Sequence, residues 1–446
     1  MKVAIIGSGI SGCAAAWHTS AFAEVCVFES EDRLGGHTHT QQVSLEGVSF
    51  PVDTGFIVFN HRTYPGLKAW FELLGVETAK SDMSFSASLN QGSLEWCGTD
   101  LNSVFAQRSN LASPKFWWML ADIIRFNRYA PVHAAHYRQL PGGGPTLGEY
   151  LDRHRYSGLF LDAYLLPMAG AIWSCPTEQM RAFPMATFTQ FCENHGLLTI
   201  NDRPQWYTVK NGAKTYIDKL QSTLAQLGRK VSWRTGCEIT QVVPDKNRMG
   251  STVGLNGVMN SDSGRTPFNE TFDAVIVACH SDQAAKILPQ DSSLWQAASK
   301  VRYQHNTAIL HTDTSLMPKR TSAWASWNYL HDHHHEGSSI SVTYWMNRLQ
   351  PLPVKTPVLV SLNPVRQPRP DTVINTMEYM HPIFDGPAVA AQKNIPAFQG
   401  EHGIWLAGAW LRYGFHEDGY QSAVQAVQSL KSAFESRHDQ QYPRAA

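Results

Sequence analysis

Several features of common protein classes are missing from this 446-residue chain. It has no excess of charge, because Lys plus Arg and Asp plus Glu both number 37. It therefore lacks the positive potential that holds a nucleic acid by counterion release. No apolar run approaches the roughly 18 residues that cross a bilayer. We therefore expect neither a nucleic-acid partner nor an integral membrane protein.

Paired cysteines are missing as well. The cysteines are odd in number, scattered, and form no Cys-x-x-Cys motif, which predicts reduced and mostly buried thiols. There are seven: Cys13, Cys26, Cys97, Cys175, Cys192, Cys237 and Cys279. An apolar strand from Lys2 to Ile6 leaves no room for a cleavable leader before it. We therefore expect a cytoplasmic protein.

A metal site is not predicted either. The tract His331-Asp-His-His-His-Glu336 has residue types that bind metals. It lacks the helical i, i+4 spacing and a second ligand cluster at zinc-site spacing. Short histidine-rich tracts are weak signals alone, so we predict a solvated loop here.

The length of the chain exceeds what one hydrophobic core usually serves, which predicts two interlocked domains. Apolar strand patterns and glycine turns mark a cofactor domain in three parts, residues 1–81, 205–300 and 400–446. Longer aromatic-rich segments and proline breaks mark a substrate domain inserted twice, at 82–204 and 301–399. Within the cofactor domain we expect a strand at 238–243, a turn at Asn256-Gly257 and a strand at 274–278.

A glycine fingerprint lies between the first strand and a helix of small residues. It reads Gly7-Ser-Gly9-Ile-Ser-Gly12, and Glu29 ends the second strand 20 residues after Gly9. The glycines suit a tight turn, close approach of backbone to a pyrophosphate, and close helix packing. Glu29 can accept hydrogen bonds from ribose hydroxyls and disfavours a 2′-phosphate. The motif predicts FAD or NAD binding on a βαβ unit.

A second motif distinguishes between the two cofactors. It reads Glu29-Ser-Glu-Asp-Arg33-Leu-Gly35-Gly36-His-Thr38 and is followed by Val52-Asp53-Thr-Gly55. This run resembles the second glycine motif of the flavin-containing amine oxidase, phytoene desaturase and protoporphyrinogen oxidase superfamily. The resemblance implies FAD as the cofactor. It also implies a Rossmann-like α/β fold of the glutathione-reductase type, with an inserted α+β substrate domain.

The resemblance extends through nearly the whole chain. Gly236-Cys-Glu-Ile239 resembles the strand that holds adenine, and Gly408 to Tyr420 resembles the last flavin motif, where a helix N-terminus faces the ring. A helix dipole there would stabilise the negative charge of reduced flavin. The resemblance implies these cofactor contacts: Gly7, Gly9, Ile10, Ser11, Gly12, Glu29, Ser30, Arg33, Leu34, Gly35, Gly36, His37, Thr38, Gly55, Phe56, Ile57, Ile239, Gly408, Asp418, Gly419 and Tyr420.

More narrowly, the chain is similar to a bacterial subgroup of FAD-binding proteins. The similarity rests on Leu310-His-Thr-Asp, Ala325-Ser-Trp-Asn-Tyr329, Ser361-Leu-Asn-Pro364 and Gly414-Phe-His-Glu-Asp-Gly419. Members of this subgroup are often associated with lipid methyltransferases of the cyclopropane-fatty-acid-synthase type. The resemblance therefore implies a long apolar acyl substrate and a lipid methyltransferase partner.

The chain also departs from the broader superfamily. The lysine that faces flavin N5 in amine oxidases is absent, since Asn306 or Thr307 stands at its expected position. Ala409 replaces an acid of the last motif, and His37 replaces an arginine. Position beside the flavin makes His416, Glu417 and Asn60 the catalytic candidates. His416 could move a proton, or with Glu417 it could only order the helix and loop.

Three functions stay open at this level. The first is FAD-dependent hydride transfer on an apolar, lipid-like acyl substrate. The second is an amine-oxidase-type enzyme, which would need a cationic or carboxylate-binding cage. The third is a non-catalytic accessory flavoprotein that partners a lipid methyltransferase. The segment 114–129, apolar with flanking cations, fits an interfacial helix at a membrane surface or a buried core helix.

Overall fold

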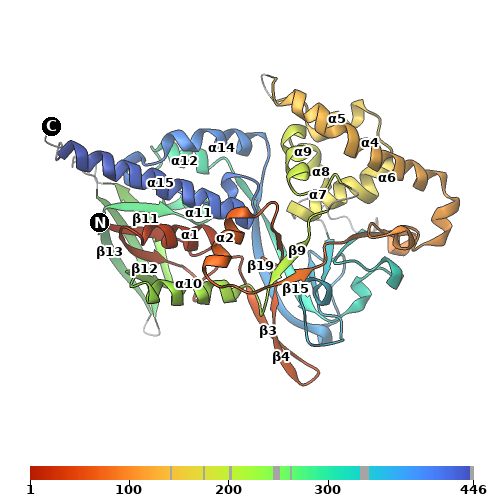
Figure 1. The fold of residues 1–446 in the computed structure, drawn as a ribbon, viewed down its shortest axis with the longest axis horizontal. Coiled ribbons are helices and arrows are strands. Elements are labelled where there is room, and N and C mark those ends of the chain that lie inside the picture. Colours follow the sequence, from red (N-terminus) through yellow and green to blue (C-terminus); the bar gives the residue numbers. More distant parts are fainter. Residues whose placement is uncertain are drawn as a thin grey trace.

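The structure, a computed structural model, describes residues 1–140, 143–173, 176–199, 203–244, 252–261, 264–331 and 341–441. Two lobes lie along the long axis of the molecule (Figure 1). Both termini belong to one lobe, and the helices α4 to α9 belong to the other. The fold is α/β, with a Rossmann-like lobe into which the second lobe is inserted, as the sequence predicts.

A parallel five-stranded sheet forms the centre of the first lobe, which we call the cofactor lobe. Side chains alternate between the two faces of a strand, so Val3 and Ile5 enter one core while Ala4 and Ile6 enter another. Because both faces are covered, the strands are almost continuously apolar. The strand order is β10 (Val231–Arg234), β2 (Glu24–Phe28), β1 (Lys2–Ile6), β14 (Ala274–Val277) and β20 (Ile404–Leu406).

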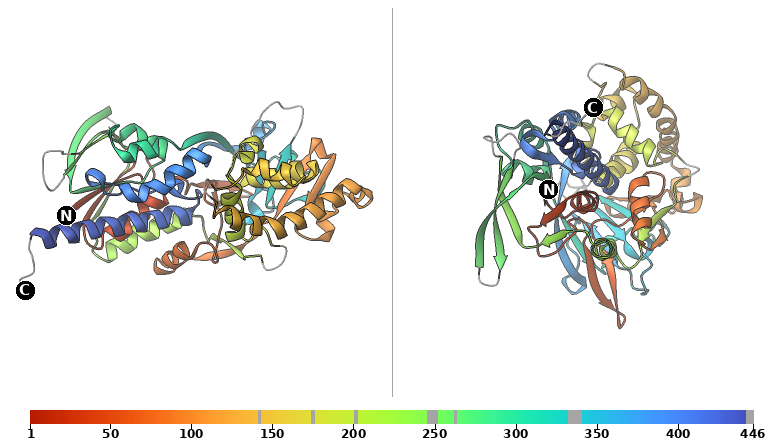
Figure 2. Two further views of the ribbon diagram at one scale, coloured as in Figure 1. Left: turned by 90° about the horizontal axis from the view of Figure 1, so that it is seen from above. Right: turned by 60° about the vertical axis from the view of Figure 1, so that its left-hand side comes forward.

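Helices cover one face of this sheet, and α15 runs along the lobe from beside the second lobe to the C-terminal end (Figure 2). This layer contains α1 (Ile10–Thr19), α2 (Pro65–Leu73), α10 (Lys214–Gln226) and α15 (His416–Gln441). The other face carries a three-stranded antiparallel sheet with α11 (Ser281–Ile287), α12 (Ser293–Ala298) and α14 (Gly386–Phe398).

The three-stranded sheet corrects one prediction. It contains β11 (Cys237–Pro244), β12 (Val253–Ser261) and β13 (Gly264–Phe272). Asn256 and Gly257, predicted as a hairpin turn, lie in the middle of β12 and pair with both neighbours. Gly257 is needed for packing, because a Cβ there would lie 2.5 Å from the Phe268 ring. The glycine therefore marks close cross-strand contact and not a change of direction.

A mixed seven-stranded sheet joins the two predicted insertions into one lobe, which we call the substrate lobe. Strand β7 pairs in parallel with β16, so Phe85 lies opposite Trp327 across more than 240 positions of sequence. The strand order is β19 (Val373–Ile383), β15 (Arg302–His311), β18 (Leu359–Leu362), β17 (Ser341–Trp345), β16 (Trp327–His331), β7 (Phe85–Leu89) and β8 (Leu94–Cys97).

Helices cap this sheet and share its apolar core. The longest is α4 (Pro114–Tyr137), and the shorter ones are α5 (Leu147–Arg153), α6 (Gly158–Phe160), α7 (Leu166–Trp173), α8 (Thr177–Arg181) and α9 (Met185–Asn194). In the described part of the chain no helix is long and apolar enough to cross a membrane. The six described cysteines are free thiols, and five of them are buried; Cys175 lies outside the described residues.

Smaller elements connect the lobes. The hairpin β3 (Thr40–Leu45) and β4 (Val48–Asp53) projects from the molecule, and β9 (Trp206–Val209) pairs with β5 (Phe59–Asn60) and β6 (Thr78–Ser81). One domain boundary differs from the sequence division. Helix α14, predicted within 301–399 of the substrate domain, packs Ala388, Ala391 and Ile395 into the core of the cofactor lobe.

Candidate functional site

The first glycine loop presents a helix N-terminus to a cavity of about 1020 Å³. Gly7 takes φ +99°, and its N–H donates to the Phe28 carbonyl at 2.8 Å. No side chain caps α1, and a Cβ built at Gly9 would meet nothing within 4 Å. The first N–H groups of α1 are thus available to a ligand phosphate.

Glu29 ties the two glycine loops together. Its carboxylate is buried and accepts hydrogen bonds from the Ser8 N–H at 2.9 Å and the Ser8 hydroxyl at 2.6 Å. The Ser8 hydroxyl in turn accepts the Gly35 N–H at 3.1 Å. The motif in the sequence predicts the role of Glu29 but not that of Ser8, although Ser8 stands inside the first glycine motif.

The second loop is shaped by backbone contacts that exclude side chains. A Cβ at Gly55 would lie 2.2 Å from the His37 carbonyl, which accepts the Phe56 N–H at 2.8 Å. Arg33 donates to the Gly36 carbonyl at 2.8 Å and pairs with Glu31 at 2.8 Å. Arg33 therefore orders the loop as well as lining the cavity.

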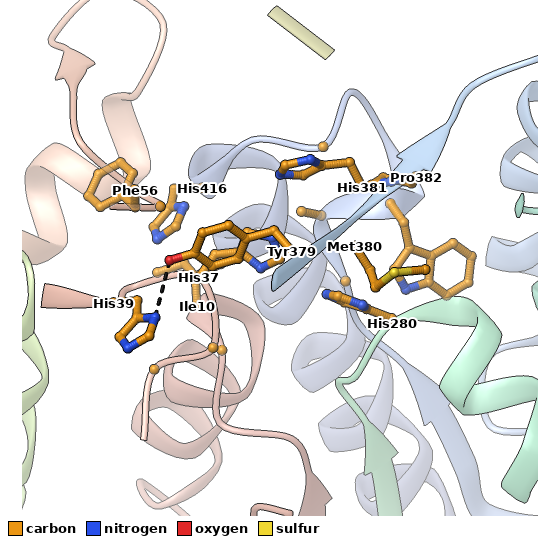
Figure 3. A pocket seen from close by; sticks show the side chains of 18 of the residues that line it. Ile10, His37, His39, Phe56, His280, Tyr379, Met380, His381, Pro382 and His416 are labelled. Carbon is orange, nitrogen blue, oxygen red and sulfur yellow. Dashed lines mark hydrogen bonds between the residues drawn. The ribbon is translucent and has the colours of Figure 1, made fainter. Parts of the chain in front are cut away.

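Three imidazoles and a tyrosine meet at the cavity wall (Figure 3). The His37 ring centroid lies 5.5 Å from that of His280, 5.3 Å from that of His381 and 5.1 Å from that of Tyr379. His37 Nε2 is buried and has no hydrogen-bond partner among the described residues. Burial lowers the pKa of His37 well below its usual value, and His381 and His280 lower it further. The cluster is therefore neutral and can donate an N–H to an oxygen of a ligand.

Of this cluster, only His37 is predicted from the sequence; the other three residues are not. His280 follows β14, and Tyr379 and His381 lie on β19. No local motif marks them, because they meet His37 only through the tertiary fold.

The C-terminal motif packs α15 against α1. A Cβ at Gly419 would lie 2.6 Å from the Ile10 side chain, so glycine allows the two helices to approach closely. Asp418 accepts the Phe415 N–H at 3.0 Å, and burial raises its pKa to about 7. The Tyr420 hydroxyl contacts His18 Nε2 at 3.1 Å.

His416, the first residue of α15, is enclosed by aromatic and polar neighbours. Its ring stacks on Phe56 at a centroid distance of 3.6 Å, and its Nε2 lies 3.1 Å from the Thr38 hydroxyl. That hydroxyl also contacts Tyr216 at 2.6 Å. Burial lowers the pKa of His416 to about 3. The imidazole is neutral at neutral pH, which fits loop ordering better than proton transfer.

Most of the predicted cofactor residues line this cavity of about 1020 Å³. They are Gly7, Gly9, Ile10, Ser11, Glu29, Ser30, Arg33, Gly35, Gly36, His37, Gly55, Phe56, Ile57, Ile239 and Gly408, together with the catalytic candidate His416. The others lie behind this lining: Gly12, Leu34, Thr38, Asp418, Gly419 and Tyr420. Among these, Gly12 abuts Gly7, where a Cβ would lie 1.9 Å from the carbonyl oxygen.

The other two catalytic candidates lie outside the cavity lining, and their side chains hold backbone. Glu417 accepts the N–H groups of Gly66 at 3.0 Å and Leu67 at 2.8 Å, and so caps α2. The Asn60 side-chain oxygen accepts the N–H groups of Arg62 at 3.0 Å and Thr63 at 2.9 Å. These hydrogen bonds give Glu417 and Asn60 a structural role.

Beyond the glycine loops the cavity continues into the substrate lobe as a region that we call the apolar arm. Apart from the imidazole of His195, which stacks on Phe191 at 3.9 Å, its lining is apolar or aromatic: Ile57, Val58, Met83, Ala171, Ile172, Trp173, Phe191, Leu197, Trp206, Ala308, Trp327, Tyr344, Val360, Leu362, Met377, Tyr413 and Phe415. The charged side chains of the described cavity lining are Glu29, Glu31, Arg33, Glu238, Lys286 and Glu378, and none belongs to the arm. The arm therefore suits an apolar ligand.

The strand expected to carry the amine-oxidase lysine has none facing the cavity. Of β15, Tyr303 and Ala308 line the cavity, whereas Asn306 and Thr307 do not. The Asn306 amide contacts His381 Nδ1 at 2.9 Å. Lys286 is the one lysine in the described lining, and it lies on α11.

The residues present fit FAD. The open space at Gly9 and the uncapped α1 suit its pyrophosphate, Glu29 lies where the second strand ends, and His37 offers an unpartnered buried nitrogen. This combination of paired glycine loops on a parallel sheet with an inserted substrate lobe defines an FAD-dependent oxidoreductase.

The comparison with known families agrees. The chain belongs to the family of flavin-containing amine oxidoreductases, whose model matches residues 10–360. No protein of curated function matches the sequence significantly.

Solved structures share the fold over nearly all of both chains. A protein from Exiguobacterium sp. 255-15, provisionally named a protoporphyrinogen oxidase, has 18% identity and a TM-score of 0.66 over 97% of this chain and 99% of that one. A fatty acid isomerase from P. acnes has 12% identity and a TM-score of 0.64 over 96% and 98%. Cyclohexylamine oxidase from Brevibacterium oxydans IH-35A has 16% identity and a TM-score of 0.63, over 97% of this chain and 99% of that one. At such low sequence identity, these structural similarities show a common fold and nothing further.

Proposed function

We propose that this oxidoreductase acts on the acyl chain of a lipid-like substrate held in the apolar arm. The observation that carries the proposal is the lining of the arm, which is apolar and aromatic and has no charged side chain among its described residues. Burying methylene groups there supplies binding energy of about 0.8 kcal/mol per CH₂. One neighbour of the same fold is named a fatty acid isomerase, so such a fold serves a fatty-acid substrate in that protein.

The residues of the chain bind and orient the substrate and keep water away. Trp173, Phe191 and Phe415 form one aromatic wall, with Phe191 and Phe415 stacked at 5.0 Å. The neutral His416 holds Phe56 and Thr38 in place beside it. The glycine loops and His37 would hold FAD, which would supply the two-electron acceptor for oxidation of the acyl chain.

The two alternatives fit the arm less well. Oxidation of an amine would be favoured by a carboxylate beside the cation, and the described lining of the arm has none. Its aromatic side chains alone could contact a cation, so the panel below includes amines. A non-catalytic accessory role would not need an enclosed apolar arm continuous with the cofactor groove. A lipid methyltransferase as partner stays a prediction.

Anaerobic mixing of the FAD-loaded protein with a panel of acyl lipids and primary amines tests the proposal. We expect an acyl lipid to bleach the flavin and simple amines to leave it oxidised. Leu362→Asp, which places a charge in the arm, should abolish bleaching while FAD stays bound. The exposed Leu73→Asp variant on α2 is the matched control and should behave as the wild type. Rapid bleaching by amines alone would refute the proposal.

We also propose that the outer face of α4 contacts a membrane surface peripherally. Its inner face is buried through Phe116, Met119 and Phe126. Its outer face exposes large apolar side chains, among them Trp118 (66% exposed) and Val132 (65%). Lys115, Arg125 and Arg128 are the cations of the helix, and its single acid, Asp122, is buried. A helix with aromatic and basic groups on one face suits a lipid interface.

A further inference from the structure

A second, smaller cavity lies beside α4. Helices α4 and α5 belong to the lobe that does not carry the termini (Figure 1). The cavity has a volume of about 220 Å³ and lies between α4, α5 and the segment that follows α5. Its lining contains one guanidinium, two imidazoles and three phenols: Arg125, His133, His154, Tyr129, Tyr150 and Tyr156. We call it the α4–α5 cavity. Neither the flavin site nor the apolar arm uses any of these six residues.

The lining is fixed by contacts among its own members. The Arg125 guanidinium lies 4.0 Å above the Tyr156 ring. His133 Nδ1 contacts the Tyr150 hydroxyl at 2.9 Å, and the His133 and His154 rings stack at 5.0 Å. The groups are thus held ready for a ligand without further ordering.

The hydrogen-bonding capacity of this cavity is that of an anion site. Arg125 Nη2 pairs with Asp122 at 2.9 Å, but Arg125 Nε is buried and has no hydrogen-bond partner among the described residues. An unpartnered buried guanidinium N–H is costly unless a ligand accepts it. Guanidinium, imidazole and phenol groups together provide N–H and O–H donors for phosphate oxygens.

The surroundings of the cavity carry positive charge. Arg128, Arg153 and Arg155 are exposed around it. Two acids near the cavity are paired, Asp122 with Arg125 and Asp152 with Arg181 at 2.8 Å, and Glu149 of α5 is engaged in a capping box at the start of that helix. Tyr129 belongs both to the cavity lining and to the exposed apolar face of α4. The cavity therefore opens where a lipid headgroup would lie if the α4 face touched a bilayer.

We propose that the α4–α5 cavity binds the phosphate of an anionic phospholipid headgroup while the outer face of α4 contacts the same bilayer. This inference rests on the proposed membrane contact of α4 and adds headgroup selectivity to it. Trp117 and Trp118 provide apolar contact with any bilayer, and the cavity provides the preference for a negatively charged surface.

Vesicle co-sedimentation of the full-length, FAD-loaded protein tests the inference. Vesicles of phosphatidylcholine alone are compared with vesicles that also contain phosphatidylglycerol. We expect the wild type to bind the phosphatidylglycerol vesicles more tightly. Arg125→Gln should reduce the ratio of the two affinities about fivefold, the usual effect of one cation near an anionic surface. His154→Gln should reduce the preference in the same direction. Arg108→Gln is the matched control, because it removes the same charge from an exposed arginine just before α4 and outside the cavity, and it should keep the preference.

The outcomes separate the two levels of the proposal. Equal binding of the wild type to both kinds of vesicle overturns the headgroup site and leaves the membrane contact standing. Binding to neither overturns both. Equal loss in Arg125→Gln and Arg108→Gln shows diffuse charge attraction and also overturns the site. Competition by free glycerol phosphate as effective as the vesicles would assign the cavity to a soluble phosphate and overturn the lipid source. Trp118→Ser should weaken binding to both kinds of vesicle.

Discussion

Gly9 is expected to be required for cofactor binding but not for folding. The variant Gly9→Val therefore tests cofactor binding separately from stability. The residue has φ −61° and ψ −176°, which any amino acid can adopt, and a Cβ there would meet nothing within 4 Å. The fold should therefore tolerate the change. The only cost is the weaker preference of valine for the N-cap of α1, about 1 kcal/mol at most. The same side chain would occupy the space above the first N–H groups of α1, where the pyrophosphate binds.

Thermal unfolding with and without FAD measures both quantities. Ligand at a hundredfold excess over its Kd stabilises the wild type by about 2.7 kcal/mol. We predict that Gly9→Val unfolds near the wild-type apo temperature and gains no stability from FAD. Gly158→Val is the control, since the nearest atom to its Cβ is Asp162 Oδ2 at 3.9 Å and it lies away from the cavity. Full FAD-dependent stabilisation of Gly9→Val would refute the reasoning.

Three further predictions concern polar side chains. His416→Ala should lower FAD affinity and leave the rate of anaerobic flavin reduction within about tenfold, since a slowing of about 10²- to 10⁴-fold would instead indicate general acid–base catalysis. Glu417→Ala should cost about 1 kcal/mol in urea unfolding through the lost cap of α2, with unchanged FAD occupancy; lost flavin reduction at full occupancy would contradict this. Burial lowers the pKa of His311 to about 4, and its Nδ1 accepts the Asp313 N–H. Because the unfolded state binds a proton at this residue more readily, its contribution to the free energy of unfolding is complete above pH 6.5. That contribution falls by about 1.4 kcal/mol per pH unit as the pH drops from 6.5 to 4. His311→Gln should flatten the slope of unfolding free energy against pH in that window, and an unchanged slope would exclude the residue.

The sequence predicts what local patterns determine. The glycine loops, the strand at Lys2 to Ile6 and Glu29 stand in short, ordered motifs, and the structure gathers them around the cavity. The inserted arrangement of the substrate lobe also follows from changes in composition along the chain.

What the sequence does not predict depends on distant contacts. His280 and His381 join His37 only when β14 and β19 meet the second glycine loop. The Asn256-Gly257 pair has the composition of a turn, but the Phe268 ring on the neighbouring strand determines its role. The histidine-rich tract falls mostly outside the described residues, and among the described ones no group of three or more His, Cys, Asp or Glu could hold a metal.

The most direct test of the apolar arm is the dependence of anaerobic flavin reduction on acyl chain length. Each added methylene buried in the arm contributes about 0.8 kcal/mol, which is about a fourfold gain in apparent affinity. We predict that the acyl-lipid concentration for half-maximal reduction falls by about this factor per carbon until the arm is full, and then levels off. A concentration that does not change with chain length, or reduction by short polar amines alone, would contradict the assignment of an acyl substrate.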